Sequence, residues 1–155
     1  MSVAFRRESD EEHLEPKFEI PHPPGPNLVT PRGLSLIETR NAELEAEIAA
    51  APTPERLAEL QRDLRYWRQR LATAQIAPNA PGAIVAFGTR VTIEQDGARR
   101  TLDIVGHDES DPAEGRIAFT APLAKVLIGA EQADEIDAPG PRGPITVINV
   151  DPLPG

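Results

Sequence analysis

The chain has 155 residues, a formal net charge of -9 and no cysteine, which excludes a disulfide framework and a thiolate metal site. No apolar run approaches the roughly 18 residues that a bilayer-spanning helix needs, and the charged N-terminus lacks the apolar core of a secretory signal. Residues 78–155 hold twelve acidic and six basic residues, an excess that argues against autonomous binding to duplex DNA. We therefore expect a cytoplasmic protein of one or two small domains, without a metal or cofactor.

Residues 1–29 form the first distinct segment because they combine acidic residues with proline. Four prolines fall within Ile20–Pro26, and proline removes backbone donors and fixes φ, so this stretch cannot be helical. We expect a disordered or extended N-terminal arm. The arm is either a solvated tail or a segment that lies along the body of the protein or along a partner.

Residues 30–77 carry apolar residues at heptad spacing. In the second half of this segment the steps alternate between three and four residues, at Leu57, Leu60, Leu64, Trp67, Leu71 and Ala74. In the first half, two rows with seven-residue spacing repeat the pattern, at Leu34, Asn41 and Ile48 and at Ile37, Leu44 and Ala51. An isolated helix of about 20 residues is marginal in water, so each apolar stripe needs cover. The segment therefore predicts an antiparallel two-helix coiled coil.

Two Thr-Pro pairs mark the starts of these helices. Thr30 and Thr53 can each cap a helix, and the proline that follows suits the first helical position, where its missing N–H costs nothing. The break between the two helices is then the tip of the hairpin, which consists of Pro52, Thr53, Pro54, Glu55 and Arg56.

Two residues of the heptad seam leave alternatives open. Asn41 is either a buried polar residue that fixes the register of the helices or a hydrated residue at the edge of the seam. Trp67 is either a core residue, packed on the first helix or on a second domain, or a platform for ligand stacking.

The periodicity changes after a linker at residues 78–82. Residues 83–150 predict short strands, one hairpin turn at Gln95–Ala98 and one short helix, with the strands at 89–94, 99–105, 116–120, 134–137 and 145–150. The helix is expected at Pro122–Ile128, with Leu123, Val126 and Leu127 on its apolar face. These elements indicate an α+β domain with an antiparallel sheet, followed by a tail at 151–155.

The connection Gly106–Gly115 is polar and acidic. Its carboxylates, Asp108, Glu109 and Asp111, form either a cation site or an acidic surface loop.

Several motifs of the C-terminal half, in this order and spacing, resemble the bacterial Gre transcript-cleavage and elongation factors (GreA/GreB). The matching stretches are Val85–Val91, Ile104–Asp111, Gly115–Ile117 and Ala121–Gly129. The last stretch, Ala-Pro-Leu-Ala-Lys-Val-Leu-Ile-Gly, is similar to the Ser-Pro-Ile/Leu-Ala-Arg-Ala-Leu-Leu-Gly pattern of the family. Upstream, Leu28–Leu34 and Leu71–Ile76 resemble the start and the end of the family's coiled-coil domain.

The resemblance implies an N-terminal coiled coil and a C-terminal domain of FKBP-like fold, in a monomer that binds RNA polymerase. In the family, the C-terminal domain docks at the rim of the secondary channel and the coiled coil enters it. Nucleic acid is then contacted only within the polymerase complex. Carried over to this chain, the partner-binding residues are Asp108, Thr120, Ala121, Pro122, Leu123, Ala124 and Lys125.

The tip and the coil length depart from the family's cleavage factors. Those factors carry an Asp and a Glu at the tip that help to hold a second Mg²⁺, whereas Glu55 is the single tip carboxylate here and Arg56 follows it. One carboxylate beside an arginine is a poor ligand set for a hard divalent cation. The coil is also shorter, which resembles the small regulators of nucleoside diphosphate kinase.

The expected function is that of a Gre-type elongation regulator with weak or absent stimulation of transcript cleavage. No catalytic residue is assigned, because any RNA cleavage would be carried out by the polymerase itself. One alternative is a cleavage-competent factor in which Glu55, together with Glu59, serves the metal. A second alternative, a peptidyl-prolyl isomerase, rests on the FKBP-like fold alone, and Phe87 and Phe119 are the only aromatic residues available for its pocket.

Overall fold

The computed structural model describes residues 19–50, 52–78 and 80–154. Most of the expected N-terminal arm, the seam residue Ala51 and the linker residue Asn79 lie outside the described residues. The chain divides into two compact units. Within the described residues, the first unit contains 19–25 and 37–72, and the second contains 26–36 and 73–154.

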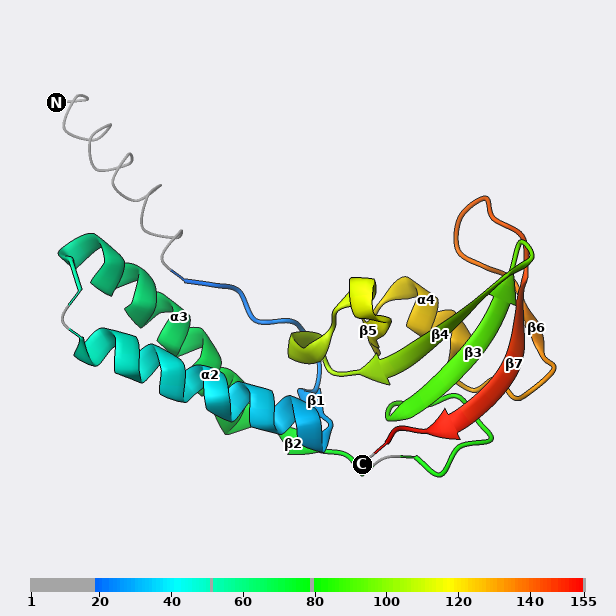
Figure 1. Cartoon of the computed structure of the whole chain (residues 1–155), viewed down its shortest axis with the longest axis horizontal. Helices are drawn as coiled ribbons and strands as arrows, with labels where there is room; N and C mark the ends of the chain where they lie inside the picture. The colour runs from blue at the N-terminus through cyan, green and yellow to red at the C-terminus, as the bar shows by residue number, and fades with distance from the viewer. Residues whose placement is uncertain (1–18, 51, 79, 155) are drawn as a thin grey trace, which may run out of the picture. The chain divides into compact units, whose positions relative to one another are not determined.

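Two helices form the predicted hairpin. Helix α2 spans Pro31–Ala49 and helix α3 spans Pro54–Thr73, and the two run side by side in opposite directions (Figure 1). Thr30 Oγ1 accepts a hydrogen bond from the Gly33 amide at 3.0 Å, and Thr53 Oγ1 accepts one from the Arg56 amide at 3.3 Å. Both Thr-Pro pairs therefore cap helices, and the two-helix prediction is confirmed.

The heptad seam supplies the core of the first unit, but the predicted pattern fails near the C-terminal end of α3. Leu44, Leu60 and Leu64 are buried together, and Ile48 and Trp67 pack against them. Trp67 is thus a core residue. In contrast, Leu71 is 37% exposed, while Tyr66 and Arg70 are buried although they lie outside the predicted seam.

The burial of Tyr66 has a cause outside the two helices. The chain before α2 lies along α3, where the His22 ring stacks on the Tyr66 ring with centroids 5.1 Å apart and planes inclined by 9°. The neighbouring residue Glu19 pairs with Arg65 at 2.8 Å. The described part of the N-terminal arm therefore covers a second face of α3, which a two-helix heptad pattern does not include.

Asn41 resolves to the first of its two alternatives. Its side chain is 7% exposed, and its Nδ2 donates to the carbonyl oxygens of Ile37 at 2.9 Å and Trp67 at 3.0 Å. The second bond joins α2 to α3, so Asn41 links the helices at one defined register.

A two-stranded ribbon lies at the base of the hairpin within the second unit. Strand β1 (Leu28–Val29) pairs in parallel with β2 (Gln75–Ile76), and the Gln75 amide donates to the Asn27 carbonyl at 2.8 Å. Residues 28–29 are extended, as expected of the arm, whereas the second helix ends at Thr73 and does not continue to residue 76. The chain segments on both sides of the hairpin are hydrogen-bonded to each other instead.

The main sheet of the second unit has five strands in the order β5-β4-β3-β7-β6 (Figure 1). The strands are β3 (Thr89–Gln95), β4 (Ala98–Val105), β5 (Arg116–Ala118), β6 (Glu135–Ile136) and β7 (Ile145–Pro152). The turn between β3 and β4 forms as predicted, with Asp96 at φ 53° and Gly97 at φ 81°. The α+β class is therefore confirmed.

One strand pair corrects the expectation of an antiparallel sheet. Strand β5 runs parallel to β4, with Arg116 opposite Asp103. Parallel neighbours cannot be joined by a tight turn. The chain instead passes through the 3-10 helices η2 (His107–Glu109) and η3 (Pro112–Glu114), so that β5 runs in the same direction as β4.

The short helix also differs from its predicted packing. Helix α4 spans Pro122–Leu127, and Ala124 and Leu127, three residues apart, are both fully buried in the core of the sheet. Val126, which the sequence places on the apolar face, is 37% exposed. The prediction is correct for Leu127 and for Leu123, which packs against the core, but wrong for Val126, whose place is taken by Ala124.

Candidate partner-binding site and hairpin tip

The tip of the hairpin carries an arginine held by two carboxylates. Arg56 Nη1 donates to Glu59 Oε1 at 3.1 Å, and its Nη2 donates to Glu47 Oε1 at 3.2 Å across the hairpin. These hydrogen bonds, to Glu59 first and Glu47 second, raise the pKa of Arg56. The sequence-based reading missed Glu47, because its closeness to Arg56 depends on how the two helices align.

The remaining predicted tip residues are open to solvent. Thr53, Pro54 and Glu55 are exposed, and Pro52 is half-buried. In the described ranges, which omit Ala51 and the first 18 residues, no group of three His, Cys, Asp or Glu side chains could hold a metal ion. The sequence suggested Glu59 as a second metal ligand beside Glu55, but the Glu59 carboxylate is paired with Arg56.

The predicted partner-binding residues fall on two separate elements. Asp108 lies half-buried in η2, whereas the other six precede or begin α4. Thr120, Pro122 and Lys125 are exposed, and Ala121 and Leu123 are half-buried against the core. Ala124 is a correction, because its side chain is fully buried beneath the helix and cannot touch a partner.

Three exposed apolar residues extend this surface. Val126 and Ile128 are 37% and 41% exposed, and Ile84 is 50% exposed. The backbone brings Ile84 beside them, because the Gly129 amide donates to the Val85 carbonyl and the Val85 amide donates to the Ala130 carbonyl, both at 2.8 Å. We call Pro122, Lys125, Val126, Ile128 and Ile84 the α4 surface. Of the three exposed apolar residues, only Val126 carried a sequence-based prediction, which placed it on the buried face of the helix.

The acidic connection holds a buried carboxylate that fastens the start of α2. The Glu109 side chain is 3% exposed, and its Oε1 accepts a hydrogen bond from Thr30 Oγ1. Its Oε2 accepts one from Arg32 Nη1 at 2.8 Å. We call these three residues the Glu109 clasp. Glu109 is therefore neither a cation ligand nor an exposed residue of a surface loop, which corrects both readings for this side chain.

Two glycines allow the clasp to close. A Cβ on Gly33 would lie 2.9 Å from Glu109 Oε1, and a Cβ on Gly106 would overlap the carbonyl oxygen of Leu28. Glycine at both positions lets the backbone of η2 approach β1 and the first turn of α2.

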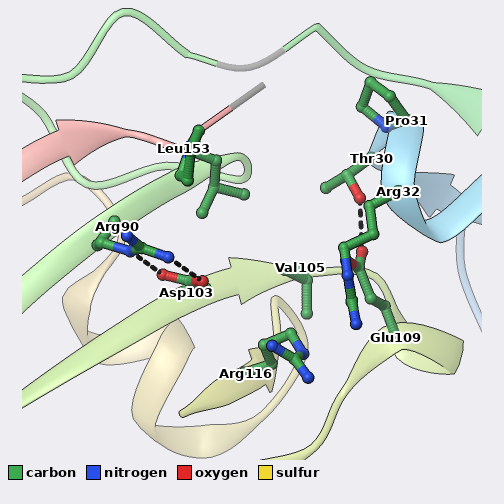
Figure 2. Close-up of a pocket in the computed structure, with 10 residues that line it drawn as sticks. Thr30, Pro31, Arg32, Arg90, Asp103, Val105, Glu109, Arg116 and Leu153 are labelled. Atoms are coloured by element: carbon green, nitrogen blue, oxygen red, sulfur yellow. Dashed lines mark hydrogen bonds and ion pairs between the residues drawn. The ribbon is translucent and has the colours of Figure 1, made fainter. Parts of the chain in front are cut away.

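A pocket of about 180 Å³ lies beside the clasp (Figure 2). Arg32 and Glu109 lie at one end and the Arg90–Asp103 pair at the other, with Arg116 between them. Arg90 donates to both carboxylate oxygens of Asp103, from Nε at 2.7 Å and from Nη2 at 3.0 Å. Such a bidentate pair is the stronger form of ion pair, and it raises the pKa of Arg90.

The arrangement defines a class of protein, a capped helical hairpin joined to an α+β domain with an exposed helix surface. Comparison with known families gives the class a name. Residues 80–152 match the family "Transcription elongation factor, GreA/GreB, C-term". The resemblance stated above is confirmed, and residues 80–152 are similar to the C-terminal domain of the GreA/GreB factors.

Curated relatives agree with that family. The chain is 36% identical over 87 residues to transcription elongation factor GreA of Desulfovibrio desulfuricans, covering 54% of either protein. It is 38% identical over 101 residues to GreB of Xanthomonas axonopodis pv. citri, covering 61% of this chain and 60% of the relative. The chain thus spans between half and two thirds of these relatives.

Solved structures of the same group are also similar. A GreA/GreB factor from Nitrosomonas europaea aligns at TM-score 0.40 and 19% identity, over 83% of this chain and 99% of that one. The GreA factor homolog Gfh1 of Thermus thermophilus aligns at TM-score 0.39 and 15% identity, over 81% of this chain and 99% of that one. Among the described helices, none is long and apolar enough to cross a membrane.

Proposed function

We propose that this protein is a Gre-type transcription elongation regulator that binds RNA polymerase and acts through its secondary channel. The observation that carries the proposal is the GreA/GreB C-terminal domain at residues 80–152. The relatives named above are elongation factors, so they lend no support to the peptidyl-prolyl isomerase alternative.

The α4 surface is the proposed docking site. Its exposed apolar side chains, flanked by Lys125 and Thr120, form the kind of surface that a protein partner covers. Asp108 is proposed as a second, charged contact to basic residues of the polymerase. Ala121 and Leu123 are assigned to support the surface from below, since both are half-buried against the core.

We propose in addition that the hairpin tip stimulates transcript cleavage weakly or not at all. The arginine-bound state of Glu47 and Glu59 supports this, because it leaves Glu55 as the tip carboxylate available to a cation. A divalent ion held beside phosphates normally needs one or two well-placed carboxylates. Any RNA cleavage would then be carried out by the polymerase, and this protein would not itself be an enzyme.

The binding experiment uses immobilised core RNA polymerase and the full chain. We expect a complex at about micromolar concentration, lost when a second secondary-channel factor is added in excess. The charge-reversed variants Asp108→Lys and Lys125→Glu test the two proposed contact regions, and Arg99→Glu on β4 is the matched control. Absence of binding by the unaltered protein would overturn the proposal.

The cleavage experiment uses backtracked elongation complexes. We expect RNA release at the same rate with and without the protein. Stimulated release that disappears in Glu55→Ala, but persists in the exposed helix variant Glu38→Ala, would instead establish the cleavage-competent alternative.

Several finer assignments accompany the proposal. We propose a monomer in the cytoplasm, where its partner polymerase is found, with nucleic acid contacted only inside that complex. We also propose that residues 30–77 act as the channel-entering hairpin and residues 83–150 as the docking domain.

A further inference from the structure

The pocket beside the Glu109 clasp carries an unassigned set of positive charges. Three arginines line it, Arg32 from α2, Arg90 from β3 and Arg116 from β5. They come from segments far apart in the chain, and all three belong to the second unit. A cavity that gathers guanidinium groups in this way is suited to an anion.

The carboxylates in the pocket are already satisfied by other partners. Both oxygens of Asp103 are bound by Arg90, and both oxygens of Glu109 are bound by the clasp. A cation would have to break these bonds to find ligands. The pocket is therefore unsuited to a metal ion, and its chemistry is that of a hydrogen-bond donor.

Arg116 is the arginine whose donors are left over. Its Nε is buried and has no hydrogen-bond partner among the described residues. Its Nη2 lies 3.9 Å from Asp111 Oδ2, which is too long for a hydrogen bond. Buried polar groups are almost always paired, so the unpaired Arg116 guanidinium, in a side chain that lines the pocket, indicates a missing acceptor.

Arg32 adds a second donor at the same pocket. Its Nη1 donates to Glu109, but the side chain is 54% exposed, so the other guanidinium nitrogens are available to a ligand. In Figure 2, Arg116 lies between the clasp and the Arg90–Asp103 pair. An acceptor with several oxygens could reach Arg116 and Arg32 together.

We propose that this pocket binds a small phosphate-bearing anion, with Arg116 as its principal ligand and Arg32 as the second. The planar fork of a guanidinium matches two phosphate oxygens, and arginine is the residue of choice for phosphate recognition in proteins. The proposal goes beyond the proposed function and needs no polymerase, so either can fail without the other.

The test is isothermal titration calorimetry of the full chain with pyrophosphate, at low ionic strength. We expect saturable binding, weakened by about tenfold or more in Arg116→Gln. The control Arg99→Gln removes one positive charge from an exposed pair with Glu94 and is expected to bind within about twofold of the unaltered chain. If Arg116→Gln does not fold, Arg116→Lys keeps the charge but loses the fork, and it is expected to bind several-fold more weakly.

Two further titrations define the ligand. Equal affinity for pyrophosphate and a nucleoside triphosphate assigns the site to free phosphate groups, and tighter binding of the triphosphate assigns it to nucleotides. Citrate is the carboxylate competitor. The proposal is overturned if pyrophosphate does not bind, if Arg116→Gln and Arg116→Lys both bind as the unaltered chain does, or if citrate binds as tightly as pyrophosphate.

Discussion

Glu109 and Thr30 are 79 residues apart in the chain, yet Glu109 Oε1 accepts a hydrogen bond of 2.5 Å from the Thr30 hydroxyl. The same hydroxyl oxygen caps α2 by accepting from the Gly33 amide. One threonine therefore both begins the helix and joins it to η2. Loss of Glu109 would disturb a helix cap and a buried hydrogen bond together.

Replacing Glu109 by Ala is expected to lower the free energy of unfolding by about 2 to 3 kcal/mol, because it removes a buried, charge-assisted acceptor. The measurement is urea unfolding of the full chain. The control is Glu114→Ala in η3, an exposed acid five residues on, expected to change stability by less than about 0.5 kcal/mol. Equal midpoints for the two variants would mean that the clasp does not stabilise the fold.

Gly106→Ala is expected to destabilise the second unit by about 2 kcal/mol or more, since its Cβ would overlap the Leu28 carbonyl oxygen and push η2 away from β1. Thermal unfolding by circular dichroism would measure the effect. Ser110→Ala, exposed at the other end of η2, is the control and is expected to leave the midpoint unchanged. A normal midpoint for Gly106→Ala would contradict the close approach.

Asn41→Ala is expected to cost about 1 to 2 kcal/mol, because the carbonyl oxygens of Ile37 and Trp67 lose a buried donor. Trp67 fluorescence during urea unfolding reports on the same helix pair. The control is Thr39→Ala at an exposed position of α2, which should unfold at the same urea concentration as the unaltered protein. A neutral effect of Asn41→Ala would show that water replaces the amide at no cost.

Arg90→Gln is expected to lower stability by about 1 kcal/mol, a value reduced because the Arg90 side chain is 41% exposed. The pKa of Arg90 is raised by its hydrogen bond to Asp103. A raised pKa contributes stability that is lost only as pH rises through the folded-state value, far into the alkaline range. The loss in Arg90→Gln should therefore be equal at about pH 6 and about pH 9, and smaller for Arg99→Gln. A loss that grows between these two pH values would implicate another titrating group.

Val126→Glu is expected to weaken the proposed complex with RNA polymerase by about tenfold or more, because a charge is placed in the apolar part of the α4 surface. The unfolding midpoint should stay the same, since Val126 is already exposed. Ile76→Glu is the control, at a side chain that is 59% exposed on β2. If both variants bind equally well in the pull-down, docking does not use α4.

Local chemistry was enough to predict the helices, the β3–β4 turn and the general class of the fold. Thr30 and Thr53, each followed by proline, indicate helix starts, and Gly97 indicates a turn. These signals act over a few residues, so tertiary packing does not alter them. The motifs of the C-terminal half likewise indicated the resemblance to GreA/GreB factors that the family match confirms.

The errors share a different cause. Tyr66 is buried by His22, Glu109 by the start of α2, and Val126 is exposed because Ala124 and Leu127 already fill the sheet face. The exposure of each of these side chains depends on which distant segment of the chain packs against it. Periodicity cannot supply that information, and it is why the clasp and its pocket were not predicted.

The parallel ribbon of β1 and β2 has a consequence for how this protein can be divided. Residues 26–36 include the first turns of α2, yet they belong to the same unit as residues 73–154, so that unit is discontinuous in sequence. A fragment that starts at the linker would lack Leu28–Val29 and the start of α2, so Glu109 would lose both its hydrogen-bond donors and the segment that buries it. Conversely, the hairpin is an insertion whose two ends are held together. Equal additions to both helices would lengthen it without altering those ends.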